Sequence, residues 1–321
     1  LKQRRPAYAL PLLWVGVMLL PTILAEDTPH FLRAVGVWPL LALLPALGLE
    51  AVWTAMSGQP DAARGAAKPV AFKFAPPELI DNEKRLLEKA DVVFTGGQSL
   101  YEAKKDKHAY VYPLPSRINT KHFNQARFVG EEPADEKAVP HPRFGYCGVI
   151  DERMDIALLG KMAEMRPEWH FVMIGPVVKI AEEDLPRRAN IHYLGGKNYQ
   201  ELPAYISGWD VALMPFAMND STKFISPTKT PEYLAAGKPV VSTAIRDVVR
   251  PYGELGLVHI ASTAEEFVAA CEKALNEDTK AGLQKADEFL SHNSWDKTFA
   301  EMSRLIDEAI ERKPKAVTQA V

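Results

Sequence analysis

The sequence predicts an α/β protein whose carboxyl-terminal half is a doubly wound, Rossmann-like parallel sheet. From residue 143 to residue 260, short apolar segments alternate with longer amphipathic ones. Buried parallel strands have such short, continuously apolar sequences, and the helices that connect them cover both faces of the sheet. A ligand of this kind of sheet is expected at the carboxyl ends of its strands.

Composition excludes several classes of protein. The chain has 321 residues, with 38 Lys and Arg against 41 Asp and Glu, and its net charge of −3 argues against nucleic-acid binding through bulk positive charge. Two cysteines, Cys147 and Cys271, do not make a disulfide framework. The sequence has no His-Glu-x-x-His, no Cys-x-x-Cys and no P-loop motif, so we expect no metal site and no P-loop nucleotide site.

The amino-terminal region is apolar and has two open interpretations. Residues 6–25 carry no charge and follow three basic residues, and residues 34–53 are interrupted only by Glu50. Each run is long enough to cross a bilayer, yet four prolines interrupt them, and buried elements of an α/β domain have similar sequences. We therefore expect a cytoplasmic protein and leave open its attachment to the inner face of the membrane.

The pattern of apolar and turn residues divides the chain into five parts. Helices are expected at 77–90, 98–105, 155–165, 199–206, 227–236, 263–275 and 295–312, and strands at 91–95, 109–114, 143–150, 170–174, 190–194, 210–215, 239–243 and 256–260. Charge and proline mark a linker. The expected parts are an apolar region of uncertain structure (1–67), an α/β part (68–130), the linker (131–141), the doubly wound domain (142–294), and a closing helix and tail (295–321).

The segment from Phe224 to Val241 carries the chemistry. Ser226 is a suitable N-cap and Pro227 a suitable first residue of a helix, whose unpaired N–H groups would bind an anion such as pyrophosphate. Lys229 lies in the same turn and can add a full positive charge. The carboxylate of Glu232, further along the helix, can accept hydrogen bonds from the two vicinal hydroxyls of a ribose. The alternatives without a binding role are a solvent-exposed lysine at 229 and an acid at 232 that only stabilises the helix dipole.

This segment resembles the donor-site helix of retaining glycosyltransferases of the GT-B fold, family four (glycosyltransferase group 1), in the variant Ser-Pro-x-Lys-x-x-Glu. The match runs through Ser226-Pro-Thr-Lys-Thr-Pro-Glu232-Tyr-Leu-Ala-Ala-Gly-Lys-Pro-Val-Val241. Residues 143–155 resemble the first strand and loop of the same domain, and 171–176, 191–195 and 210–215 its later strands. The resemblance covers residues 142–309, and residues 71–123 as the last portion of an acceptor-side domain.

The resemblance implies a set of site residues. It makes Arg153 and Lys229 catalytic, because both would hold the departing diphosphate. The alternative for Arg153 is a surface ion pair with Asp151 or Asp155, without a catalytic role. The donor-binding residues it implies are Gly148, Gly175, Lys197, Tyr199, Phe224, Ile225, Ser226, Pro227, Thr228 and Glu232. Phe224 stands where the family often has an acid, eight positions before Glu232, and the region before Ala71 is too short for a complete acceptor-side domain.

The resemblance implies a metal-independent transferase without a cofactor. Its donor substrate would be a nucleoside-diphosphate sugar, with UDP or GDP, and its acceptor a polysaccharide, lipid-linked or other cell-envelope glycan. Contact with a membrane surface remains open, and no nucleic-acid partner is expected. Two alternatives also remain open: a non-catalytic or truncated nucleotide-sugar-binding module, and a nucleotide-sugar 2-epimerase, which would need further acids and histidines in the cleft.

Overall fold

The computed structural model describes residues 77–312, except residues 116 and 293. The chain divides into two units, 1–70 and 71–321, and the described residues all belong to the second. The apolar runs at 6–25 and 34–53 therefore lie outside the described residues. Among the helices that the structure describes, none combines the length and apolarity needed to cross a membrane.

A six-stranded sheet forms the centre of residues 143–260, as the alternating apolar segments predict. Its strands are β3 (Arg143–Cys147), β4 (His170–Ile174), β5 (Ile191–Gly195), β6 (Val211–Met214), β7 (Val240–Ser242) and β8 (His259–Ile260). All neighbouring strands are parallel, in the order β5-β4-β3-β6-β7-β8. The order runs one way from β3 to β5 and the other way from β6 to β8, so the topological switch lies between β3 and β6. A crevice for ligands is expected there, outside the carboxyl ends of these two strands.

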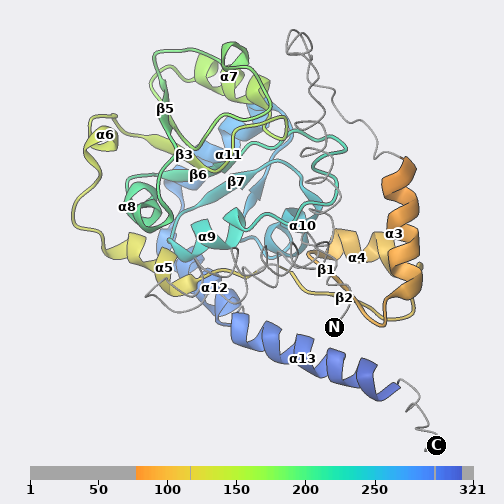
Figure 1. Cartoon of the computed structure of the whole chain (residues 1–321). Coiled ribbons are helices and arrows are strands. Elements are labelled where there is room, and N and C mark those ends of the chain that lie inside the picture. The colour runs from red at the N-terminus through yellow and green to blue at the C-terminus, as the bar shows by residue number, and fades with distance from the viewer. Residues whose placement is uncertain (1–76, 116, 293, 313–321) are drawn as a thin grey trace, which may run out of the picture. The chain divides into compact units, whose positions relative to one another are not determined.

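Helices flank the six-stranded sheet (Figure 1). Two clusters of buried apolar side chains cover it, one on each face. Side chains alternate along each strand: Phe171 and Met173 of β4 enter one layer, and Val172 and Ile174 the other. The first layer is completed by α7 (Ile156–Met165) and α11 (Ala264–Asn276). The second is completed by α8 (Leu202–Ser207), α9 (Lys229–Ala235) and α12 (Thr279–Ser291). Strand residues that are apolar on both faces are what the sequence pattern requires.

A smaller α/β part precedes this sheet in the sequence, and it is the part expected to lie on the acceptor side. Strands β1 (Val93–Thr95) and β2 (Val111–Pro113) form a two-stranded parallel sheet, accompanied by α3 (Pro77–Lys89) and α4 (Gln98–Lys104). The closing helix is α13 (Trp295–Arg312). Each of these elements lies within a few residues of its expected position.

The structure also contains short helices that the sequence analysis did not anticipate. The expected loop before Phe123 holds α5 (Thr120–Asn124), followed by a 3₁₀ turn (Gln125–Phe128), and the expected linker holds α6 (Ala134–Lys137). The helix expected at 199–206 begins as a 3₁₀ turn (Tyr199–Glu201) that leads into α8. The unanticipated α10 (Arg246–Val248) with a wider turn (Val249–Gly253) follows β7. A final 3₁₀ turn spans Glu182–Asp184. The linker is thus a packed element, because Glu136 of α6 is fully buried.

Candidate functional site

Two glycines bring the ends of β3 and β4 into contact. Gly148 follows β3 with φ +147°, and Gly175 follows β4 with φ +146°. A Cβ on Gly175 would stand 1.9 Å from the carbonyl oxygen of Gly148, so no side chain fits at that position. Both residues need glycine for conformation and for space, and both lie at the carboxyl edge of the sheet, Gly148 partly buried and Gly175 buried.

Lys229 extends from the start of α9 over this edge. A Cβ on Gly148 would lie 2.3 Å from Lys229 Cε and 2.5 Å from its Nζ, which shows that the lysine occupies the space above the glycine. The Nζ atom also lies 5.6 Å from the centre of the Tyr146 ring, whose hydroxyl donates to the carbonyl oxygen of Val149 at 3.0 Å. The structure therefore brings Lys229, Gly148 and Gly175 together at the topological switch.

The start of α9 differs from its predicted position. The helix begins at Lys229, its N-cap position is Thr228, and no side chain caps it. Ser226 is not the N-cap and Pro227 is not the first helical residue, so both expectations were wrong. The physical reason is that Ser226 packs elsewhere, since a Cβ on Gly97 would lie 2.8 Å from Ser226 Cβ. Pro231 in the first turn also lacks an N–H group.

Glu232 lies one turn into α9 and is partly buried. Burial raises the pKa of its carboxyl group, while the charge of Lys229 and a hydrogen bond with Thr228 act in the opposite direction. Both Glu232 and Lys229 are close enough to influence the ionisation of Cys147 at the end of β3. Glu232 and Lys229 of α9 thus both lie near the carboxyl end of β3.

Arg153 is engaged in an ion pair. Its Nε lies 3.0 Å from both carboxylate oxygens of Asp151, and its Nη2 lies 2.7 Å from Oδ2. Burial alone would raise the pKa of Asp151, but the hydrogen bonds from Arg153 hold it below its ordinary range. The carbonyl oxygen of Arg153 accepts from Ala217 N–H, which fixes this loop beside the exit of β6. The guanidinium remains 41% exposed and lies within electrostatic reach of Tyr146.

Lys197 and Tyr199 make their contacts with other elements. Lys197 Nζ lies 2.5 Å from Asp135 of α6, and this carboxylate raises the pKa of Lys197 to about 12. The Tyr199 ring stacks on His122 of α5 at 4.2 Å between centres, and its carbonyl oxygen lies 2.9 Å from His122 Nε2. The donor-binding role of both residues stays a prediction.

The segment before α9 presents one exposed ring. Phe224 is 38% exposed, and the Lys223 ammonium lies 5.4 Å from its centre. Ile225 packs against the apolar layer of α9, and its N–H donates to the carbonyl oxygen of Thr222. Pro227 and Thr228 are partly buried. Among the described residues, no group of three His, Cys, Asp or Glu side chains could hold a metal ion.

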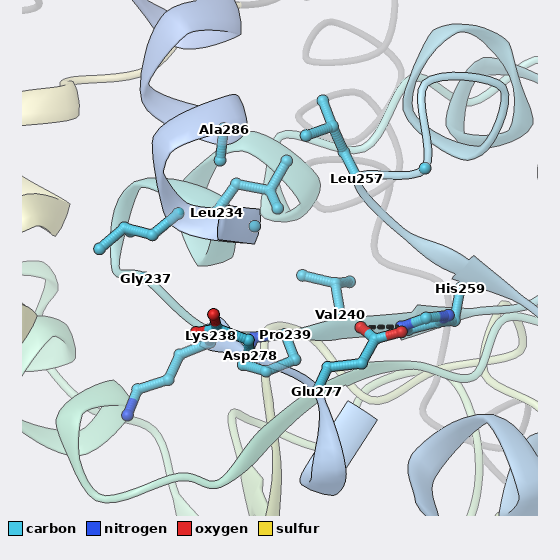
Figure 2. A pocket seen from close by; sticks show the side chains of 13 residues that line it. Leu234, Gly237, Lys238, Pro239, Val240, Leu257, His259, Glu277, Asp278 and Ala286 are labelled. Carbon is cyan, nitrogen blue, oxygen red and sulfur yellow. Dashed lines mark hydrogen bonds and ion pairs between the residues drawn. The ribbon is translucent and has the colours of Figure 1, made fainter. Parts of the chain in front are cut away.

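A shallow pocket lies at the other edge of the sheet (Figure 2). It is lined at the amino ends of β7 and β8 by Pro239, Val240 and His259, and the His259 ring is paired with Glu277 at 2.9 Å. None of the predicted site residues lines this pocket. A second pocket is lined by Phe94, Thr95 and Gly96, near β1, and by residues of α13.

Sequence reasoning missed Tyr146 and Asp151, which support the site from β3 and from the loop that follows. Tyr146 looks like an ordinary core residue, because it lies in a continuous apolar strand. Asp151 had only been considered as a surface partner, yet it is 3% exposed. The sequence shows an acid two residues before an arginine, but it does not show that the acid is buried.

Comparisons with known proteins agree with this geometry. Residues 141–277 match the family model described as Glycosyl transferases group 1. A curated relative, provisionally named teichuronic acid biosynthesis glycosyltransferase TuaH from Bacillus subtilis (strain 168), is 28% identical over 139 residues, which are 42% of this chain and 35% of the relative. The matched segment thus spans about a third of that relative's length.

Solved structures share the fold at low identity. Anabaena Alr3699/HepE in complex with UDP-glucose has a TM-score of 0.58 at 12% identity, covering 75% of this chain and 70% of that chain. A sucrose-phosphate synthase from Thermosynechococcus elongatus has a TM-score of 0.54 at 17% identity, covering 77% of this chain and 67% of that chain. These likenesses confirm the predicted GT-B-like α/β fold. Residues 141–277 thus resemble the glycosyltransferase group 1 family and lie within a GT-B-like fold.

Proposed function

We propose that this chain is a retaining, metal-independent glycosyltransferase. It moves a sugar from a nucleoside-diphosphate sugar to a polysaccharide or lipid-linked acceptor of the cell envelope. The observation that carries the proposal is the position of Lys229 over Gly148, beside Gly175, at the topological switch of the sheet. A positive charge above a side-chain-free backbone at this point suits a diphosphate.

The chemistry of the donor explains the choice of residues. Breaking the bond between sugar and diphosphate leaves negative charge on the departing phosphate, so a fixed positive charge there lowers the barrier. Lys229 supplies that charge, and the exposed part of the Arg153 guanidinium adds to it while Asp151 fixes its orientation. Two cations in this place would take over the role that a metal ion has in other sugar transferases. The family resemblance implies retention, with the leaving phosphate accepting the acceptor's proton.

Glu232 fits the nucleoside end of the donor. Its carboxylate is partly buried beside Lys229, and an ionised carboxylate can accept hydrogen bonds from both hydroxyls of a ribose. UDP is the first nucleotide to test, because the HepE structure that resembles this chain holds UDP-glucose. The name of the Bacillus relative supports a cell-envelope polysaccharide as the acceptor class. A cytoplasmic site of action, at the inner face of the membrane, is part of the proposal.

Calorimetric titration of the full chain with UDP, GDP and ADP tests the proposal. We expect one of the three to bind, with an affinity that Glu232→Ala weakens. Release of UDP or GDP from the corresponding nucleotide sugar in the presence of cell-envelope glycans, without added metal, then tests transfer. Absence of binding by all three nucleotides would contradict the donor site.

The second candidate is a nucleotide-sugar-binding module without activity. The observation that favours it is the engagement of Arg153 with Asp151, because a cation fully used by a neighbouring acid contributes less to a leaving group. A nucleotide that binds while its sugar conjugates remain intact with every acceptor tested would support this candidate.

A further inference from the structure

A polar junction joins α4 of the acceptor-side part to the donor-side turn. The N–H group of Ser99, in the first turn of α4, donates to Asp247 Oδ1 at 2.8 Å. Asp247 belongs to α10, which follows β7, and is 7% exposed, while Ser99 is 1% exposed. A buried carboxylate therefore binds the amino end of a helix that is 148 positions away in the sequence.

Gly97 makes the close approach possible. A Cβ at this position would stand 2.1 Å from Asp247 Oδ2 and 2.8 Å from Ser226 Cβ. Its backbone is extended, with φ −171° and ψ 167°, so any residue could adopt the conformation and only space requires glycine. The neighbouring Gly96 has nothing within 4 Å of its own Cβ position. Gly97 is thus a specific contact between the two parts, and Gly96 is its natural control.

The second oxygen of Asp247 shows which interaction matters. Asp247 Oδ2 is buried and has no hydrogen-bond partner among the described residues, and the same holds for Ser99 Oγ. The bond from Ser99 N–H to Oδ1 is therefore the interaction that offsets burial of the carboxylate. An asparagine in its place would keep this acceptor oxygen, remove the charge and put an NH2 group in the place of Oδ2.

A second contact, from the turn after α10 to α4, is more exposed. Arg250 Nη2 lies 3.4 Å from Glu102 Oε2 on α4, with side chains 46% and 30% exposed. Exposed ion pairs of this kind contribute little. The buried bond of Asp247 is accordingly the stronger of the two, and the outer pair gives a matched comparison.

We propose that Asp247 is a positioning residue that holds the Gly96–Gly97 loop and the amino end of α4 against the turn that begins at Ser226. Ser226 lies three residues before Lys229 in the sequence. The junction therefore fixes the position of the acceptor-side part relative to the donor site. The role assigned to the Ser226 turn rests on the proposed function. The contact itself does not, since Ser99, Gly97 and Asp247 meet whatever the turn binds.

Hydrogen exchange of the full chain, read by mass spectrometry over residues 98–104, tests the contact without any ligand. Asp247→Ala removes the acceptor and Gly97→Ala crowds it, so both variants should speed exchange at the amino end of α4 by about tenfold. Asp247→Asn, Arg250→Ala and Gly96→Ala should remain within about twofold of wild type. Gly97→Ala perturbs the contact by adding a methyl group and leaves the Asp247 carboxylate in place. The contact can therefore still be tested if Asp247→Ala does not fold. Unchanged exchange in Gly97→Ala, or equal acceleration in Arg250→Ala, would overturn the proposal.

The same measurement with saturating UDP, or GDP if that is the nucleotide that binds, tests registration. We expect the nucleotide to slow exchange in α4 of wild type and of Asp247→Asn. This response should be lost in Asp247→Ala and Gly97→Ala while the nucleotide Kd stays within about threefold. A response that persists in both variants, or a Kd that rises as much as in Glu232→Ala, would overturn the positioning role. Failure of wild type to bind any nucleotide would contradict the proposed function instead, and the ligand-free comparison would still decide the contact.

Discussion

The side chain of Lys229 lies over the Cα of Gly148, with its Nζ 2.5 Å from where a Cβ of Gly148 would stand. This relationship joins the start of α9 to the end of β3 across the switch point of the sheet. It distinguishes Lys229 from a solvated helix lysine, because the residue is partly buried and its ammonium group is held beside the Tyr146 ring. The position of the charge therefore depends on the absence of a side chain at residue 148.

Substitution of Gly148 should displace this charge. Gly148→Ala places a methyl group where the lysine lies and forces alanine into a positive-φ conformation. We expect the affinity for UDP to fall by about tenfold and the free energy of unfolding by about 1–2 kcal/mol. Calorimetric titration and chemical denaturation measure the two effects.

Gly196→Ala is the matched control for this prediction, because a Cβ there would meet only Pro176 Cδ at 4.0 Å. It lies after the carboxyl end of β5, at the same edge of the sheet. Wild-type affinity in Gly148→Ala would show that Lys229 does not need its place over the glycine.

Removal of the Lys229 charge should affect turnover more than binding. Lys229→Ala deletes a cation whose value rises as the diphosphate departs, so kcat for donor turnover should fall by about 100-fold. The Kd for UDP should rise by only about threefold, because backbone groups of the turn still bind the phosphates. Steady-state kinetics and calorimetry separate the two quantities.

Lys273→Ala serves as the control, since the Lys273 side chain on α11 is 66% exposed and forms an ion pair with Glu277. Equal losses in kcat and in affinity for Lys229→Ala would indicate that the lysine binds the ground state as strongly as the transition state.

Substitution of Glu232 should affect nucleotide binding and protein stability in opposite directions. Burial raises the pKa of this carboxyl group, so the folded protein binds a proton there more tightly than the unfolded chain. The group's contribution to stability is therefore present at low pH and is lost as pH rises through the folded pKa. Glu232→Gln removes this loss, and its melting temperature at neutral pH should equal or exceed that of wild type.

The affinity of the same variant should change in the opposite direction. An uncharged amide donates as well as accepts and binds two ribose hydroxyls less well, so the Kd for UDP should rise by about tenfold. In wild type, UDP affinity should weaken as pH falls through the raised pKa of Glu232, whereas Glu232→Gln should lack this pH dependence. A variant that lost stability and affinity together would instead point to a structural role.

The fold could be predicted from sequence because buried parallel strands are apolar on both faces. All six strands of the main sheet were found from apolar runs such as 170–174 and 210–215. The α12 helix was missed because its face is weakly apolar, with only a few buried residues such as Ala286 and Leu290.

The site could be predicted in part. Lys229 and Glu232 were predicted from the expected helix start, and Gly148 from the family resemblance; the structure places Lys229 over Gly148. The contacts of Ser226 and Lys197 could not be foreseen, because their partners Gly97 and Asp135 lie far away in sequence and carry no local signal. Residues that act through tertiary contacts, such as Asp247, are recognised only once the two parts are seen side by side.

Glu136 makes the stability of the linker sensitive to pH. Its side chain is fully buried in α6, and Trp209 Nε1 donates to its Oε1 at 2.7 Å. Burial raises the pKa of Glu136 to about 7, although Trp209 and the nearby charge of Arg143 oppose this shift. Between its ordinary pKa and about 7, the folded protein holds a proton on Glu136 that the unfolded chain has released.

Stability should therefore fall as pH rises from about 4.5 to 7 and be constant above that range, as far as this group is concerned. Glu136→Gln keeps an acceptor for Trp209 and has no proton to lose, so at pH 8 it should be more stable than wild type by up to about 3 kcal/mol. At pH 5 the two proteins should unfold at nearly the same temperature. Glu168→Gln, an exposed acid 57% accessible to solvent, should keep the wild-type profile. If the stabilities of wild type and Glu136→Gln changed with pH in the same way across this range, the prediction would be wrong. The charge of Arg143 would then stabilise the ionised carboxylate enough to offset its burial.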